Sequence, residues 1–192
     1  MIYKDKVFEG EELKGQDFGN SEFINCRFIG VNLRFTSFDK CKFERCDLSG
    51  NIFDITSFSE CFFPETNLSN LDLGDVNLRD CDFSKVMAKN TVFQQLKQGV
   101  RNDHKKFDLK GENFQDADLT NAIFVFADLT DADFRKASIE SVVFERCILK
   151  NTNFTEAKIG GVNFNESKIE NTILDIEGFI SYGNSKGFVL EK

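Results

Sequence analysis

Large apolar residues recur at every fifth position along most of the chain. One run of such centres extends from Phe8 to Phe93, with Ala88 as its only small member, and a second run extends from Leu109 to Leu174. The position two residues before each centre is mostly small, commonly Ala, Cys, Thr or Val. A strict period of five fits neither an α-helix, with its period of about 3.6, nor a long strand, whose side chains alternate. The pattern predicts an all-β solenoid of five-residue units.

A longer period is superimposed on the period of five. Phe23, Phe43 and Phe63 recur at every fourth unit, and so do Cys41 and Cys61. Four units therefore make one coil, and the 18 units of the first run and 14 of the second make about eight coils. Because side chains two apart in an extended segment share a face, the centre and the small residue are expected to point inward. Adjacent coils would lie ~4.8 Å apart, so the rod would be about 40 Å long.

This repeat resembles the motif of the pentapeptide-repeat family, which is a small residue, Asp or Asn, Leu or Phe, and two polar residues. The unit Ala-Asp-Leu-Thr-Asn at 117–121 is an example, and the resemblance covers residues 6–174. It implies the right-handed quadrilateral β-helix of that family, which is often dimeric. The expected parts of a single domain 1–192 are repeats at 6–93 and 107–176, an insertion at 94–106 and a C-terminal segment at 177–192 that caps the solenoid or forms a dimer.

The repeat is interrupted near 94–108. The slots that would hold centres there contain Gln98 and Asp103, which cannot fill an apolar interior, and the register shifts by one residue. Residues 92–106 are expected to form a short helix or a projecting loop. The insertion is either a tolerated surface segment or a partner-contacting loop that carries Lys97, Arg101, His104, Lys105 and Lys106.

The regions that follow the two runs depart from the motif in different ways. Phe107 and Glu112 are unusually large for the small slot, so we expect the solenoid to restart irregularly. After Leu174, two short apolar runs flank a glycine-containing loop, which is typical of a hairpin or of a short helix followed by a strand. This tail either caps the exposed end of the core or forms a homodimer interface. Candidate interface residues are Ile123, Phe126, Phe179, Tyr182, Phe188 and Leu190.

Catalytic and metal-binding motifs are not evident. All six cysteines occupy the small inward slot, so we expect free, buried thiols rather than disulfides or a metal site. The single histidine, His104, has no nucleophile at a motif spacing, and no glycine-rich phosphate loop is present. We therefore expect no cofactor and no enzymatic activity. The absence of a long apolar run indicates a cytoplasmic protein without a membrane partner.

Acidic residues gather toward the middle of the predicted rod. The net charge of −8 argues against direct binding of nucleic acid, because backbone binders need clustered Lys and Arg, and it favours basic protein partners. The acidic group, to which Asp108 and Glu112 also belong, is either a solvated face or a partner-binding belt. The proposed belt consists of Asp72, Asp75, Asp80, Asp82, Asp116, Asp118, Asp128, Asp131 and Asp133.

The family resemblance also suggests a function. Some bacterial members, the Qnr-type quinolone-resistance proteins and the mycobacterial fluoroquinolone-resistance protein, resemble a DNA duplex in shape and charge and engage DNA gyrase or topoisomerase IV. The resemblance therefore implies a DNA mimic that binds a type II topoisomerase and confers fluoroquinolone or toxin resistance. The alternative is a general protein–protein interaction scaffold, since exposed apolar residues such as Ile123 can mark a partner site. Both hypotheses describe a non-enzymatic solenoid that binds another macromolecule.

Overall fold

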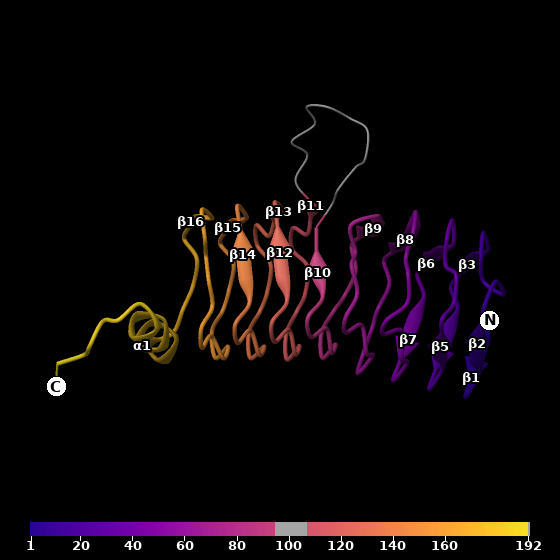
Figure 1. Ribbon diagram of the computed structural model, residues 1–192, viewed down its shortest axis with the longest axis horizontal. Coiled ribbons are helices and arrows are strands. Elements are labelled where there is room, and N and C mark those ends of the chain that lie inside the picture. The colour runs from indigo at the N-terminus through magenta and orange to yellow at the C-terminus, as the bar shows by residue number, and fades with distance from the viewer. Residues whose placement is uncertain (95–106, 192) are drawn as a thin grey trace, which may run out of the picture.

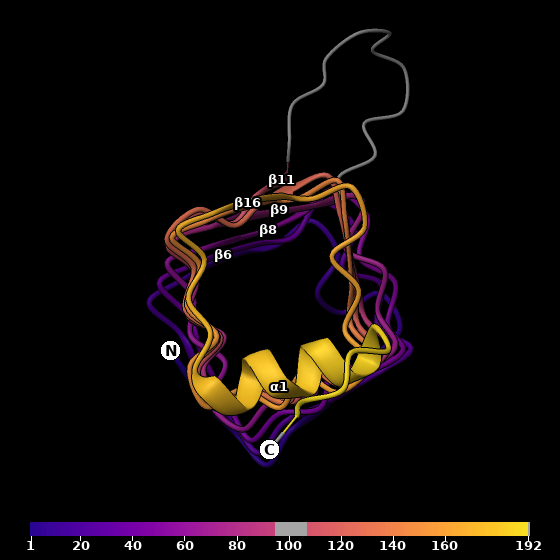
Figure 2. The same cartoon turned by 90° about the vertical axis from the view of Figure 1, so that its left-hand side faces the viewer.

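The chain winds into a straight rod with four sides. The computed structural model describes residues 1–94 and 107–191. These residues form a right-handed quadrilateral β-solenoid of about eight coils, as the family resemblance implied. Figure 1 shows the coils stacked along the rod, and Figure 2 shows the four sides in an end-on view with helix α1, Ile176–Ser185, lying across the C-terminal end.

Short parallel strands mark the four sides. The first side contains β1 (Ile2–Lys4), β4 (Glu22–Ile24) and β7 (Lys42–Glu44), and the second contains β2 (Val7–Glu9) and β5 (Arg27–Ile29). The third contains β10 (Val92–Phe93), β12 (Ile123–Val125) and β14 (Val143–Glu145). The fourth contains β3 (Asp17–Gly19), β6 (Ser37–Asp39), β8 (Thr56–Ser59) and β9 (Val76–Arg79), followed by β11 (Phe107–Asp108), β13 (Ala127–Asp128), β15 (Ile148–Lys150) and β16 (Lys168–Glu170).

Each coil pairs with the next in a register of four units, except across the insertion. Phe23 lies opposite Phe43, as the repeat predicts. Across the insertion, Asp82 lies opposite Asn113, so the partners there are further apart in sequence than elsewhere. The insertion thus adds two complete units and one residue more. The phase of the sequence repeat shifts by only one residue, because inserting a multiple of five residues does not change the phase.

The solenoid restarts in register after the insertion, so the expectation of an irregular restart was wrong. Phe107 and Glu112 both occupy the small slot and are buried. Phe107 lies opposite Ala127, and the same register places Ala132 opposite Glu112. These alanines in the next coil leave room for the larger side chains.

The interior is built from columns of stacked phenylalanine rings. One column contains Phe23, Phe43, Phe63, Phe83, Phe114, Phe134 and Phe154, with successive ring centroids 4.7 to 5.3 Å apart. A second column continues from Phe93 through Phe124 and Phe144 to Phe164. Rings of neighbouring columns meet edge to face, a favourable aromatic arrangement. An even number of sides keeps Phe above Phe, which explains the excess of this residue.

Helix α1 covers part of the C-terminal end of the core (Figure 2), whereas the last-coil centre Ile169 remains 56% exposed. Its N-cap, Asp175, accepts a hydrogen bond from the backbone N–H of Gly178 at 2.7 Å, and Tyr182 packs on Phe164 with ring centroids 5.4 Å apart. The expected short helix and C-terminal cap are therefore confirmed, but the expected strand after the helix was wrong. The chain instead folds back along the helix, where the N–H of Phe188 donates a hydrogen bond to the carbonyl of Gly183, and no sheet edge is extended.

Candidate interaction surfaces

The acidic belt is a ring around the rod rather than one face. Asp82 and Asp133 lie on the first side, Asp118 on the second and Asp128 on the fourth. Because these sides point in different directions (Figure 2), a flat partner surface can contact only part of the belt.

Three belt residues are held by neighbours within the rod. Asp118 lies 2.9 Å from the Lys89 ammonium, Asp128 lies 3.4 Å from that of Lys110, and Asp133 lies 2.7 Å from the Arg135 guanidinium. Each also accepts a hydrogen bond from the backbone N–H two residues later, as Asp and Asn do in turns. These aspartates therefore stabilise the repeat, and their charges are largely compensated.

The pKa values of two of these aspartates agree with the contacts. Partial burial raises the pKa of Asp118, but the hydrogen bonds from Lys89 and Thr120 outweigh burial and hold it below its ordinary value. Burial likewise raises the pKa of Asp133, and the hydrogen bonds from Arg135 more than offset this effect. Both side chains are therefore anionic and paired at neutral pH.

The other belt residues are more available to a partner. Asp80 and Asp131 occupy exposed corners on the edge between the fourth and first sides, and Asp82 lies beside them, half-buried, on the first side. Asp80 has only a 3.9 Å contact with Arg79. Asp82 and Asp131 form no ion pair with another described residue, and the same holds for Asp75 and Asp116 at other corners. We call Asp80, Asp82 and Asp131 the acidic edge.

The two other acidic residues of the central group differ in burial. Asp108 is exposed on β11. Glu112 was expected to be an outer acid, but it is buried because the small slot points inward.

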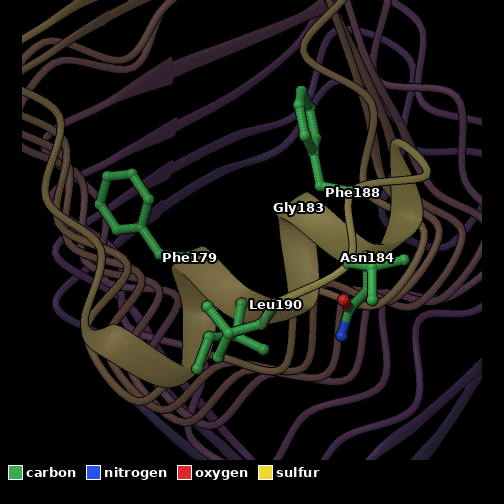
Figure 3. A pocket seen from close by; sticks show the side chains of 7 residues that line it. Phe179, Gly183, Asn184, Phe188 and Leu190 are labelled. Carbon is green, nitrogen blue, oxygen red and sulfur yellow. The ribbon is translucent and has the colours of Figure 1, made fainter. Parts of the chain in front are cut away.

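An apolar groove lies at the C-terminal end of the rod. It has a volume of about 240 Å³ and is lined by Phe179, Ile180, Gly183, Asn184, Phe188, Val189 and Leu190. Figure 3 shows the side chains that project from α1 and the tail. Phe179, Phe188 and Leu190 are 63%, 73% and 66% exposed, whereas Tyr182, also expected at an interface, is directed to the core. Large exposed apolar groups at one end of a rod are typical of an association site.

A smaller apolar area lies beside the insertion. Ile123 and Phe126 are both exposed, as expected, and Val143 lies opposite Ile123 one coil further on. The expected helix or loop at 92–106 lies largely outside the described residues, but its first part is strand: Val92 pairs with Ile123 in β10 and β12. The candidate loop residues Lys97, Arg101, His104 and Lys105, with Lys106, also lie outside the described residues.

The sequence interpretation did not select Ile52, which is 79% exposed on the third side. The signal was available, because Ile52 directly precedes the centre Phe53 and this slot points outward. Polar residues fill the same slot in many units, so a bulky aliphatic residue there stands out once the register is known.

The described cysteines belong to the core of the rod. All six cysteines are buried thiols, as expected, and burial raises the pKa of the Cys46 thiol to about 12, which makes it unreactive. Within the described ranges, no group of three or more His, Cys, Asp or Glu side chains could hold a metal ion. No described helix has the length and hydropathy needed to cross a membrane.

Comparison with known proteins points to one family. A family model described as "Pentapeptide repeat region" matches residues 101–174, and one described as "Pentapeptide repeats (8 copies)" matches 13–50 and 56–95. No curated protein sequence matches the chain.

Several solved structures are similar to this chain. A trypsin-treated form of QnrB1, a plasmid-mediated fluoroquinolone resistance protein, is 15% identical with a TM-score of 0.50, and the match covers 100% of this chain and 99% of that one. HetL from a Nostoc cyanobacterium is 16% identical with a TM-score of 0.41, covering 91% and 87%. A thylakoid-lumen protein of Arabidopsis thaliana is 17% identical with a TM-score of 0.19, covering 83% and 72%. At these identities the likeness to QnrB1 shows the fold alone.

Proposed function

Because this chain belongs to the pentapeptide-repeat family, we propose that it acts without catalysis, as a rod that binds another macromolecule through its outer surface. Stacked rings fill the interior along the rod, which leaves recognition to the residues that point outward. The regular geometry of the coils would then serve to hold outer side chains at fixed intervals.

The partner that suits this surface best is a protein that itself binds DNA. The observation that supports this choice is the acidic edge, where Asp80, Asp82 and Asp131 carry charges that the described rod does not closely pair. A basic DNA-binding groove is attracted to such charges by the same long-range electrostatics that attract it to phosphates. We therefore propose a type II topoisomerase, DNA gyrase or topoisomerase IV, as the partner, and protection against fluoroquinolones or toxins as the result. This function includes a cytoplasmic location and no direct binding of nucleic acid.

A gyrase supercoiling assay tests this proposal. Purified protein at micromolar concentration should relieve inhibition by a fluoroquinolone. The triple variant Asp80→Asn, Asp82→Asn, Asp131→Asn should lose most of the relief. Asparagine keeps the hydrogen-bond acceptor of each side chain, so the fold should persist.

A matched control separates surface charge from net charge. The triple variant Asp118→Asn, Asp128→Asn, Asp133→Asn removes the same number of charges, but from residues that pair within the rod. It should retain more of the relief than the acidic-edge variant. No relief by the natural protein would reject the topoisomerase proposal, and equal losses in both variants would reject the acidic edge as its site.

A second function, a scaffold that associates through its end, is favoured by the C-terminal groove. We propose that two copies associate through α1 and the tail, because Phe179, Phe188 and Leu190 present apolar surface that a single rod leaves in water. The double variant Phe179→Ser, Leu190→Ser should convert a dimer to a monomer in sedimentation equilibrium. Phe126→Ser, on the side of the rod, should leave the dimer unchanged. A natural protein that is monomeric at tens of micromolar would exclude this interface.

A further inference from the structure

Some turns of the solenoid are completed by a side chain from the next coil. At one of them, the Thr66 hydroxyl accepts a hydrogen bond from the N–H of Cys46 at 3.1 Å and donates one to the C=O of Phe43 at 2.7 Å. A single hydroxyl thus provides hydrogen bonds for a backbone C=O and for the backbone N–H three residues later, at the two ends of one turn. Asn51 and Ser167 make the same pair of hydrogen bonds at two other turns. We call this arrangement a turn clamp.

Glu112 occupies the clamp position in the first coil after the insertion, but it makes only half of the clamp. Its Oε1 accepts a hydrogen bond from the N–H of Cys81 at 3.2 Å. Its Oε2 is buried and has no hydrogen-bond partner, the one such side-chain atom among the described residues. In the other clamps the second hydrogen bond goes to the carbonyl three residues before the N–H donor, which here is Leu78.

An ionised carboxylate cannot complete the clamp, because it has no hydrogen to donate. The protonated acid has an O–H and can act as Thr66 and Asn51 do. We propose that Glu112 is a neutral carboxylic acid in the folded protein and that its Oε2 hydroxyl donates to the carbonyl of Leu78, which makes the coil junction after the insertion a pH-dependent latch.

The charges around Glu112 favour the neutral form. Burial, together with the nearby Cys81, Asp80 and Asp82 in the preceding coil, raises the pKa of Glu112 to about 8. The hydrogen bond from the Cys81 N–H acts in the opposite direction, but its effect is smaller. In the next coil, Asp131 and Asp133 flank the facing alanine and direct their carboxylates to Asn151 and Arg135. No described lysine or arginine forms an ion pair with Glu112. A charged carboxylate at this position would be desolvated and uncompensated, which is costly.

The direction of the pH effect follows from the two states of the chain. In the unfolded chain Glu112 titrates near its ordinary value, so between about pH 5 and pH 8 only the folded protein holds this proton. The contribution of the latch is complete at low pH and decreases as the pH rises. Relative to a variant that does not titrate, the unfolding equilibrium constant should rise about tenfold per pH unit in this window.

The variant Glu112→Gln provides the matched reference. Its amide has the same shape, accepts from Cys81 through Oε1 and donates to Leu78 through Nε2 at every pH. Denaturant unfolding of both proteins should be measured from about pH 5 to pH 9. The unfolding equilibrium constant of the natural protein divided by that of Glu112→Gln should rise about tenfold per pH unit and become constant above pH 8. A ratio that does not change with pH would overturn the proposal.

A second measurement does not depend on the variant. The ¹³C chemical shift of the Glu112 carboxyl in the folded natural protein should titrate near pH 8. A carboxyl signal that titrates in the ordinary range of glutamate would overturn the proposal, whatever the stability of Glu112→Gln.

Discussion

The two runs of the solenoid complete their turns in different ways. In the first run, most small slots from Cys26 to Cys61 hold a side chain that donates a hydrogen bond to a carbonyl of the preceding coil. In the second run, alanines such as Ala117 have no such group, and their N–H groups bond to Phe114 or its equivalent within the same turn. The first run therefore couples neighbouring coils through side chains at most of these slots. In the second run Cys147, Thr152, Ser167 and Thr172 do the same, but the alanine slots rely on backbone ladders and packing. Glu112 lies where the two patterns meet.

The largest expected effect tests what the two runs share. Phe43 and Phe134 are fully buried members of the same ring column, one in each run. Phe43→Ala and Phe134→Ala should each lower the free energy of unfolding by about 3–5 kcal/mol, because both leave a cavity between stacked rings. Denaturant unfolding monitored by circular dichroism measures the loss. If one variant showed two separate transitions and the other a single one, the runs would be independent units rather than one continuous rod.

An intermediate effect should separate a clamped turn from a turn completed by its own backbone. Thr66→Val removes a clamp and leaves the buried N–H of Cys46 without a partner, which should lower the free energy of unfolding by about 1–3 kcal/mol. Thr152→Val removes a hydroxyl that donates to the C=O of Leu129, but Ala132 already donates to that carbonyl within its own turn. The loss there should be below about 1 kcal/mol. Equal losses in the two variants would contradict the difference between these two kinds of turn.

The smallest effect concerns the corners, where the backbone adopts left-handed φ. Ile55 has φ 51° in the first run and Asn121 has φ 60° in the second, and asparagine tolerates this conformation far better than a β-branched residue. Ile55→Asn should raise the free energy of unfolding by about 1 kcal/mol, and Asn121→Ile should lower it by about 1–2 kcal/mol. Thermal unfolding scans would show both shifts. A destabilised Ile55→Asn would mean that the Ile55 side chain contributes more than its backbone conformation costs.

The period of the sequence predicted the fold but not every stacking relation. A repeat of five defines which residues point inward, so the Phe columns and the buried cysteines followed directly. It defines the register only to the nearest multiple of five, so the phase of the repeat showed one extra residue, whereas the pairing across the insertion shows two units and one residue. The tail was ambiguous for another reason: runs as short as Phe188 to Leu190 have no helical or strand period of their own.

The candidate surfaces were predicted less completely, because pairing of charges depends on which coils lie side by side. Lys89 meets Asp118 only through the altered register across the insertion. The sequence therefore grouped Asp118 with Asp80 although one is paired and the other is nearly free. Glu112 gave two conflicting signals, because it occupies the small inward slot but has an acidic side chain. In the structure its Oε2 is buried, which shows that the side chain points inward as the slot predicts.

Competition with DNA tests the central proposal most directly. The binding of the natural protein to purified DNA gyrase should be measured by fluorescence anisotropy with increasing concentrations of linear DNA and of salt. We expect DNA to displace the protein, added salt to weaken the complex, and the acidic-edge variant to bind more weakly than the variant with the paired aspartates neutralised. A complex that holds DNA and this protein on gyrase at the same time, or an affinity independent of Asp80, Asp82 and Asp131, would contradict the proposal.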